Sequence, residues 1–135
     1  MSNNMDINTL VVNPGDPGAD NKQLFVMQAP TESLGGGIRI VSASAVNGAA
    51  TGAGTTFTYQ LLRYSNAGTP AVNGTISDIL GGTAAPWGAS VPKDFAITAS
   101  DAYLSAGEWL VVDYQEITNG NPTNSVINIQ YVMGT

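Results

Sequence analysis

The side chains of this sequence that could carry acid–base chemistry are almost all carboxylates. The chain has ten Asp and Glu residues, four Lys and Arg residues, and neither His nor Cys. A Ser-His-Asp triad, a thiolate nucleophile and a zinc site built from His or Cys are therefore excluded within these 135 residues. What remains is proton transfer between paired carboxylates, or cation binding by oxygen ligands.

Three acids fall on one predicted strand, at Glu108, Asp113 and Glu116. Glu108 and Asp113 are an odd number of positions apart, so they point to opposite faces of an extended strand. Glu108 and Glu116 share a face, but about 26 Å separates them at ~3.3 Å per residue, which is too far for a glycosidase pair. We interpret these acids as solvated charges at strand ends, and a partner from another strand remains the one route to catalysis.

Two other patterns resemble ligand-binding loops. Residues 16–20, Asp-Pro-Gly-Ala-Asp, lack the ladder of acids and the distal Glu of an EF-hand. We interpret them as a turn, and calcium held between subunits stays open. Residues 34–37, Leu-Gly-Gly-Gly, are not followed by Lys-Ser or Lys-Thr, so they do not predict a phosphate-binding loop. No cofactor is expected.

The charge distribution excludes two classes of partner. The formal net charge is −6, and the four basic residues are scattered along the chain. Nucleic-acid binding needs clustered Lys and Arg to displace counterions, and anionic membranes would repel an acidic protein. No apolar run approaches the ~18 residues of a membrane-spanning helix, and the first residues lack the basic start of a usual signal peptide.

Short runs of Val, Ile, Thr, Tyr and Phe, separated by Gly, Pro and Asn, predict an all-β protein. Residues 126–133 form the clearest strand, with Ile127 and Ile129 on one face and Asn128 and Gln130 on the other. The other predicted strands are residues 7–12, 24–28, 37–46, 55–64, 75–80, 94–99 and 108–117. We expect an antiparallel β-sandwich, with a jelly roll of about eight strands as its topology. A barrel with the same number of strands stays open.

The expected core and turns follow from the same patterns. Phe57, Tyr59 and Leu61 share one face of their strand, and Trp109 begins the most apolar run, so we expect all four in the core. Asn-Gly pairs tolerate positive φ and suit tight turns between strands. Turns are therefore predicted at three such pairs, Asn47-Gly48, Asn73-Gly74 and Asn119-Gly120.

The Pro- and Gly-rich residues 13–21 predict a division of the chain into an extended N-terminal arm, residues 1–21, and a β-sandwich domain, residues 22–135. Residues 7–12 of the arm form either an edge strand or a strand that pairs with a neighbouring subunit. Trp87 lies in a Gly/Ala/Pro loop, where it either anchors a partner or folds back over one end of the sandwich. The candidate partner-binding residues are Met5, Ile7, Leu10, Val12 and Trp87.

The low charge indicates an assembled protein. Charged residues make up 10% of the chain, against about 25% in an ordinary soluble domain. Free monomers use surface charge for solubility and to prevent pairing of strand edges. We infer that neighbouring chains cover much of this surface, and we expect a homo-oligomer, with a trimer favoured.

Part of the sequence resembles a class of viral proteins. Phe-Ala-Ile-Thr at 95–98, followed by Tyr-Leu-Ser-Ala-Gly-Glu-Trp-Leu-Val-Val-Asp-Tyr at 103–114, is similar to the paired strands of bacteriophage virion jelly rolls. Val-Ile-Asn-Ile-Gln-Tyr-Val at 126–132 resembles their last strand. Together with the acidic, Cys-free composition, this makes the chain resemble capsid decoration (cement) proteins. The resemblance covers roughly the last 40 residues and contains no diagnostic motif.

This resemblance implies a non-enzymatic protein that binds the outer capsid lattice and stabilises it. Its partner would be the major capsid protein, and its location the outer surface of the virion head after synthesis in the host cytoplasm. Two alternatives stay open: a tail or head fibre component, and a carbohydrate-binding β-sandwich module that stacks sugars on Trp87, Tyr64 and Tyr103. An acid-dependent hydrolase is disfavoured, because no converging carboxylate pair can be named.

Overall fold

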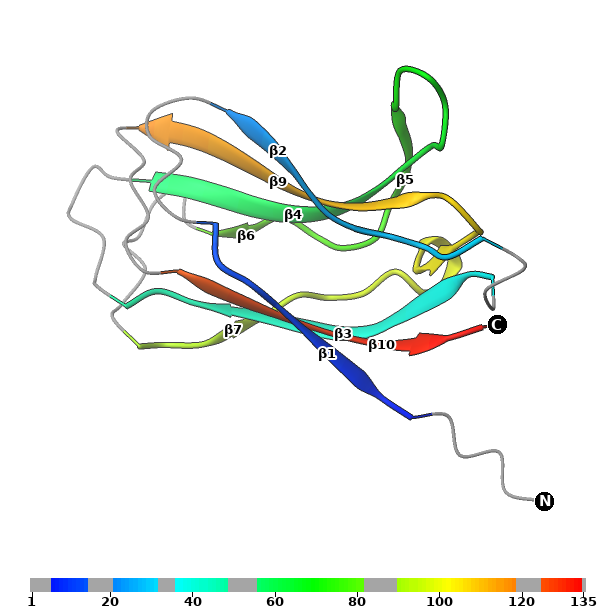
Figure 1. Ribbon diagram of the computed structural model, residues 1–135. Helices are drawn as coiled ribbons and strands as arrows, with labels where there is room; N and C mark the ends of the chain where they lie inside the picture. Colours follow the sequence, from blue (N-terminus) through cyan, green and yellow to red (C-terminus); the bar gives the residue numbers. More distant parts are fainter. Residues whose placement is uncertain are drawn as a thin grey trace.

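The chain folds as two antiparallel β-sheets packed face to face (Figure 1). A computed structural model describes residues 6–14, 21–31, 36–48, 56–81, 90–118 and 125–134. Buried apolar side chains from both sheets meet between the layers in one cluster. The predicted all-β sandwich is therefore confirmed, and the barrel is not.

The first layer, here named the β10 sheet, has β10 (Val126–Met133) between β1 (Asn8–Val12) and β3 (Ile38–Val46). Two short strands, β7 (Lys93–Asp94) and β8 (Tyr103–Leu104), pair in turn along the other side of β3. The predicted strand 7–12 is thus an edge strand of its own chain. The boundary between an arm and a body at residue 21 stays a prediction.

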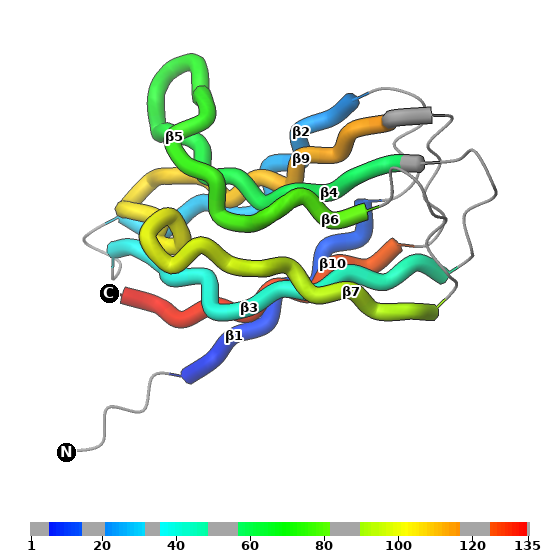
Figure 2. The backbone as a smooth tube through the Cα atoms, turned by 180° about the vertical axis from the view of Figure 1, so that it is seen from behind, coloured from blue at the N-terminus to red at the C-terminus, as the bar shows by residue number. Residues whose placement is uncertain are grey.

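The second layer, here named the β9 sheet, has β9 (Trp109–Thr118) between β2 (Lys22–Gln28) and β4 (Thr56–Tyr64). Two short strands, β5 (Val72–Thr75) and β6 (Leu80–Gly81), pair along the other side of β4. The tube in Figure 2 shows the resulting two layers from behind. Every pairing among the described strands is antiparallel.

The core is built by alternation along the long strands, because successive side chains of a strand point to opposite faces. Ile127 and Ile129 of β10 meet Phe57, Tyr59 and Leu61 of β4 in one buried cluster, as the sequence predicted. Three β9 side chains at even positions complete the same cluster, those of Leu110, Val112 and Tyr114.

Trp109 is the exception to the predicted core. Since Leu110 and Val112 face inward, Trp109 faces outward from the β9 sheet, where it is partly exposed and contacts the ring of Phe25. The expectation that it is a core residue is wrong. Residues 109–112 are all apolar, because both faces of β9 are apolar at this end. The sequence therefore does not show which of these side chains point inward.

The predicted strand 75–80 is replaced by two shorter strands, since β5 ends at Thr75 and β6 begins at Leu80. Asn73-Gly74 lies inside β5, so the predicted turn there is wrong. Gly74 is opposite Arg63 of β4, and a Cβ at position 74 would stand 2.6 Å from the Arg63 Nη2 atom. The glycine therefore leaves room for the Arg63 guanidinium, which a larger residue would displace.

The predicted strand 94–99 is also shorter than expected. It begins as β7, continues through a single bridge between Ile97 and Ser77, and then gives way to the 3-10 helix η2 (Ala99–Asp101). Of the remaining Asn-Gly pairs, Asn47-Gly48 follows β3 at a bend. Asn119-Gly120 lies outside the described residues.

Tyr59 gives the folded protein a pH dependence. Burial raises the pKa of its hydroxyl from 10.0 to about 12, so the folded state keeps a proton that the unfolded state loses above pH 10. The contribution of Tyr59 to the free energy of unfolding is therefore fully present below pH 10. It decreases by about 3 kcal/mol between pH 10 and pH 12. We expect Tyr59→Phe to flatten this fall in denaturant titrations at pH 9 to pH 12.

The matched control is Tyr64→Phe. Burial also raises the pKa of Tyr64, but this side chain is partly exposed, so the change should be in the same direction and smaller. A fall of equal steepness in Tyr59→Phe and the wild type would contradict the buried position of Tyr59.

Candidate functional site

Where β1, β10 and residues 42–44 of β3 lie side by side, the outer face of the β10 sheet carries uncharged polar and β-branched side chains. One row across the sheet runs from Thr9 of β1 to Gln130 of β10 and Ser42 of β3. The Ser42 hydroxyl and the Gln130 side-chain oxygen lie 2.6 Å apart in a hydrogen bond. The residues of this row have no ionisable side chain, which is unusual for a sheet face in contact with water.

A second row runs from Val11 through Asn128 and Ser44 to Asp94. Because the β3 positions are serines, a hollow of about 410 Å³ opens along this strand between larger neighbours. Seven residues line it: Ser42, Ala43, Ser44, Asp94, Phe95, Asn128 and Gln130. Val11 and Ile7 beside it are each 59% exposed.

The edge of this sheet lacks the features that keep strand edges apart. β1 reads Asn-Thr-Leu-Val-Val, with no charged residue and no proline. The corresponding edge of the other sheet, β2, has Lys22 at its start and a bulge after Phe25. Charges and bulges are the usual protection of an exposed edge, so β1 is the edge more open to pairing with another chain.

The predicted partner-binding residues divide on this surface. Ile7 is exposed next to β1, in agreement with a docking role. Leu10 and Val12 pack against the core of their own chain, so as placed they are not available to a partner. The side chains that point outward from β1 are instead Thr9 and Val11. Met5 and Trp87 lie outside the described residues, and their role stays a prediction.

The outer face of the β9 sheet carries a different surface, here named the aromatic patch: Phe25 of β2, Tyr64 of β4 and Trp109 of β9. The Phe25 ring meets the Tyr64 and Trp109 rings edge to face, with centroids 5.2 Å and 5.7 Å apart. Tyr64 and Trp109 stand opposite each other in the strand register. Phe25 is 45% exposed, so the patch is open to solvent.

The aromatic patch rests on apolar side chains of the same outer face. Val111 is fully buried and Leu62 nearly so, although neither belongs to the cluster between the sheets. These two residues are opposite each other in the register, and Phe25 is opposite Val111 on the other side. Burial of Val111 and Leu62 beneath the rings holds the patch in place.

Polar groups lie at both ends of the patch. At one end Asp113 of β9 accepts hydrogen bonds from the side-chain amides of Gln23, at 2.8 Å, and Gln115, at 3.0 Å. Partial burial and, to a lesser extent, the Asp113 charge raise the pKa of Tyr64. At the other end Gln28 donates to the Gly107 carbonyl at 3.0 Å and to Asn66 at 3.4 Å. Asn66 lies in the loop between β4 and β5, which rises above this sheet (Figure 1).

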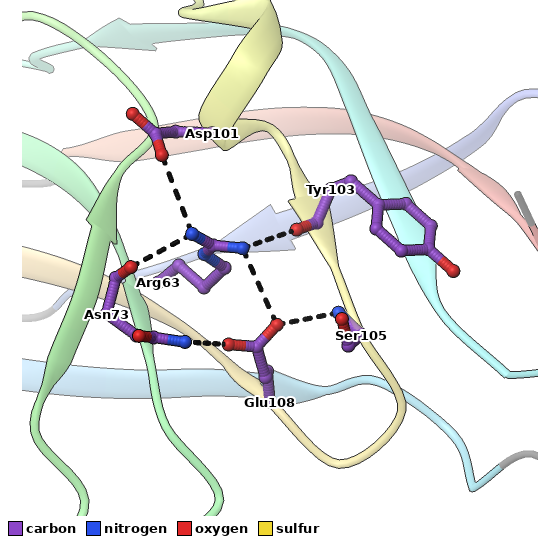
Figure 3. Close-up of polar contacts among 6 residues, drawn as sticks. All are labelled: Arg63, Asn73, Asp101, Tyr103, Ser105 and Glu108. Carbon is purple, nitrogen blue, oxygen red and sulfur yellow. Dashed lines mark hydrogen bonds and ion pairs between the residues drawn. The ribbon is translucent and has the colours of Figure 1, made fainter.

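Beneath the patch, Arg63 joins the two sheets from the inside (Figure 3). Its Nη1 donates to the Tyr103 carbonyl of β8 at 3.1 Å, and its Nη2 donates to the Asn73 carbonyl of β5 at 2.9 Å. The Asp101 carboxylate of η2 lies 3.5 Å from Nη2. One guanidinium thus ties β4 of the β9 sheet to β8 of the β10 sheet.

Glu108 is the buried counterion of this arginine. Its Oε1 lies 3.7 Å from Arg63 Nη1 and accepts the Ser105 backbone N–H at 2.7 Å. Its Oε2 accepts the side-chain amide of Asn73. The interpretation of Glu108 as a solvated charge is wrong, since only 7% of the residue is exposed. We call this set the Arg63 hub, made of Arg63, Asn73, Asp101, Tyr103, Ser105 and Glu108.

The hub positions the patch through the alternation of the strands. Arg63 and Tyr64 are neighbours on β4, and Glu108 and Trp109 are neighbours where β9 begins. The inward side chains of Arg63 and Glu108 are therefore each followed by an outward aromatic side chain. The hub also holds Asn73, and therefore β5, against β4. Sequence reasoning missed Phe25 and Trp109 as surface residues. The even spacing of Leu110, Val112 and Tyr114 was the signal that could have found Trp109.

The carboxylates of this region are arranged for structure and recognition. Glu108 faces the interior and Asp113 the outer face, as their spacing predicted, and each already has hydrogen-bond partners. Asp113 is also only 7% exposed, because Gln23 and Gln115 cover it, so its interpretation as a solvated charge is wrong too. In the part of the chain that the structure describes, no three acids gather as a metal site would require. No helix within the described ranges has the length and apolar character to cross a membrane.

No protein-family model, curated protein or solved structure matches this chain. Its function is therefore argued from the two surfaces and the hub.

The hub makes a specific prediction for stability. Arg63→Met removes the positive charge that compensates buried Glu108, and we expect the free energy of unfolding to fall by roughly 3 kcal/mol. The double variant Arg63→Met/Glu108→Leu removes both charges and should recover much of that loss, as replaced buried ion pairs do. Chemical denaturation of the three proteins measures both effects. Equal stability of Arg63→Met and the wild type would contradict the hub.

Proposed function

We propose that this chain is a non-catalytic structural virion protein that binds the outer capsid lattice and stabilises it, as a decoration protein does. The observation that carries the proposal is the edge strand β1 and the part of the outer face beside it, where the rows of Thr9 and Val11 carry no ionisable side chain as far as β3. That surface offers exposed Ile7 and Val11, hydroxyl and amide rows, and an unprotected edge strand. Such a surface suits contact with other polypeptides better than contact with water.

The proposed docking surface, the outer face beside β1, has few charged side chains. Across the strands from β1 to β3, the rows of Thr9 and Val11 carry no ionisable side chain, and the first carboxylate is Asp94 on β7. A chain of net charge −6 would repel its neighbours through acidic surfaces, so an uncharged face is the one that can approach another copy or a lattice. This supports the predicted homo-oligomer, for which we propose a trimer.

The strand order supports the jelly-roll topology that the resemblance to virion proteins implies. Strands β1 to β4 alternate between the two sheets. The sheet orders are β1-β10-β3-β7 and β2-β9-β4-β5, so β10 lies between β1 and β3, and β9 lies between β2 and β4. Two interlocked Greek keys produce this kind of order. We therefore propose that the sandwich is a jelly roll.

Stabilisation would follow from mass action. A protein that binds the assembled lattice, through its major capsid protein, better than it binds the separated subunits adds its binding free energy to the assembled state. The protein would lie on the outer surface of the virion head after synthesis in the host cytoplasm. Its net negative charge would also keep particles apart. A tail or head fibre component would use the same face on a different partner.

A pair of matched variants tests the docking face. Val11→Glu and Ile79→Glu each add one negative charge at a side chain of similar exposure, 59% and 62%, but only Val11 lies on the β10 sheet. We expect the wild type and Ile79→Glu to co-sediment with undecorated shells to the same occupancy. For Val11→Glu we expect about tenfold weaker binding, because the lattice contact would bury an unpaired charge.

Circular dichroism should show the same sheet content and similar melting for both variants, since both positions are exposed. Equal binding by Val11→Glu and Ile79→Glu would contradict the assignment of the docking face. Failure of the wild type to bind any shell would contradict the proposed function.

A further inference from the structure

We propose that the aromatic patch, Phe25, Tyr64 and Trp109, is a binding site for a neutral saccharide. This inference goes beyond the proposed function and does not depend on it, because it concerns the opposite face of the sandwich. It is carried by three observations: the arrangement of the rings, the polar groups at the ends of the patch, and the distribution of charge.

The rings offer an apolar surface that is already ordered. Saccharides present C–H faces that pack on aromatic rings, and a site whose side chains are immobile before binding loses little entropy. The Phe25 ring is held edge to face against Tyr64 and Trp109, and fully buried Val111 supports all three from below. Phe25 nevertheless remains 45% exposed.

The polar groups at the ends of the patch match the hydroxyl groups of a sugar. Asp113 with Gln23 lies at one end, and Gln28 with Asn66 lies at the other. Sites for small ligands combine an apolar floor with a few directional amide or carboxylate groups, which set orientation and specificity. Asp113 is only 7% exposed, and its two oxygens accept from Gln23 and Gln115. The groups open to a sugar hydroxyl are therefore the exposed side-chain amides that Asp113 and Gly107 hold in place, those of Gln23, Gln115, Gln28 and Asn66.

The size of the patch favours a saccharide over a protein partner. Three aromatic side chains present at most ~250 Å² each. Their sum is below the ~800 Å² that each partner contributes to a stable protein interface. The loop between β4 and β5 rises above the sheet next to Tyr64, which limits how closely a flat protein surface could approach (Figure 1).

Charge and position define the ligand further. Asp113 lies beside the patch and the chain has a net charge of −6, so an anionic saccharide would be repelled. The outer faces of the two sheets point in opposite directions (Figure 1). A protein docked through its β10 sheet would therefore present the aromatic patch outward, where a cell-surface glycan could reach it.

Of the aromatic residues first considered for sugar stacking, the structure places only Tyr64 in this patch. Tyr103 lies on β8 of the other sheet, where the Arg39 guanidinium stands 5.4 Å from its ring centroid. Trp87 lies outside the described residues. Tyr103 and Trp87 therefore supply the controls for the experiment.

The experiment follows tryptophan fluorescence in a Trp87→Phe background, which leaves Trp109 as the single indole. The probes are soluble neutral oligosaccharides of glucose, mannose, galactose and N-acetylglucosamine, with oligogalacturonate as an anionic counterpart. We expect at least one neutral oligosaccharide to change the fluorescence in a saturable way, and oligogalacturonate to have no effect. Affinity electrophoresis of the wild type in gels containing the bound sugar as a polymer should show the same preference.

Variants then locate the site. Tyr64→Ala and Phe25→Ala should each weaken binding about tenfold, because each removes one stacking surface. Tyr103→Ala keeps the backbone carbonyl through which residue 103 belongs to the hub, and it should bind as the parent does. Denaturant titration shows whether each variant is folded, and Phe25→Leu, which keeps Val111 covered, replaces Phe25→Ala if the latter unfolds.

Three results would overturn the inference: no saturable response to any neutral probe, equal loss in Tyr103→Ala and Tyr64→Ala, or loss of electrophoretic binding in Trp87→Phe alone. A fourth is loss of shell binding in Tyr64→Ala, which would make the patch part of the docking surface. The measurements of sugar binding do not require a capsid shell. The saccharide site can therefore be wrong while the proposed capsid binding is right, and capsid binding can be wrong while the saccharide site is right.

Discussion

The ion pair between Arg63 and Glu108 is the interaction on which the rest of this structure depends. The chain has four basic residues, and this one lies inside the sandwich, where it compensates a carboxylate that is 7% exposed. Without it, Glu108 would be an uncompensated buried charge, which costs several kcal/mol. The same guanidinium ties β4 to β8 across the layers and holds β5 through Asn73. It therefore determines how one end of the sandwich closes.

That closure separates two surfaces with different chemistry. On the outer face of the β10 sheet, the rows of Thr9 and Val11 carry no ionisable side chain from β1 to β3, and the sheet ends in an unprotected edge, β1, which suits contact with other polypeptides. The outer face of the β9 sheet carries three aromatic rings with amide and carboxylate groups around them. A two-layer sandwich necessarily points these faces in opposite directions. In the two roles proposed here, one small domain would bind an assembly on one side and a saccharide on the other.

The sequence predicted the layers well and the surfaces poorly. The alternation of residues 127–130 identified β10 with its correct bounds, although the register shifts between Gln130 and Tyr131. Phe57, Tyr59 and Leu61 were placed in the core correctly. Trp109 was misplaced because an apolar run conceals which face each residue takes. Glu108 was taken as solvated because its partner, Arg63, is 45 positions away and only the packing of the sheets brings them together. Asn73-Gly74 resembled a turn, whereas its glycine makes room for that same arginine.

We propose that the β10 sheet faces a capsid lattice while the β9 sheet faces away from it. Electron cryomicroscopy of shells with and without the bound protein tests this most directly, since the difference density shows the position and the orientation of the sandwich. The account predicts density on the outer surface, with β1 and β10 against the lattice and the loop between β4 and β5 pointing outward. Density with the β9 sheet against the lattice, or no added density at all, would contradict it.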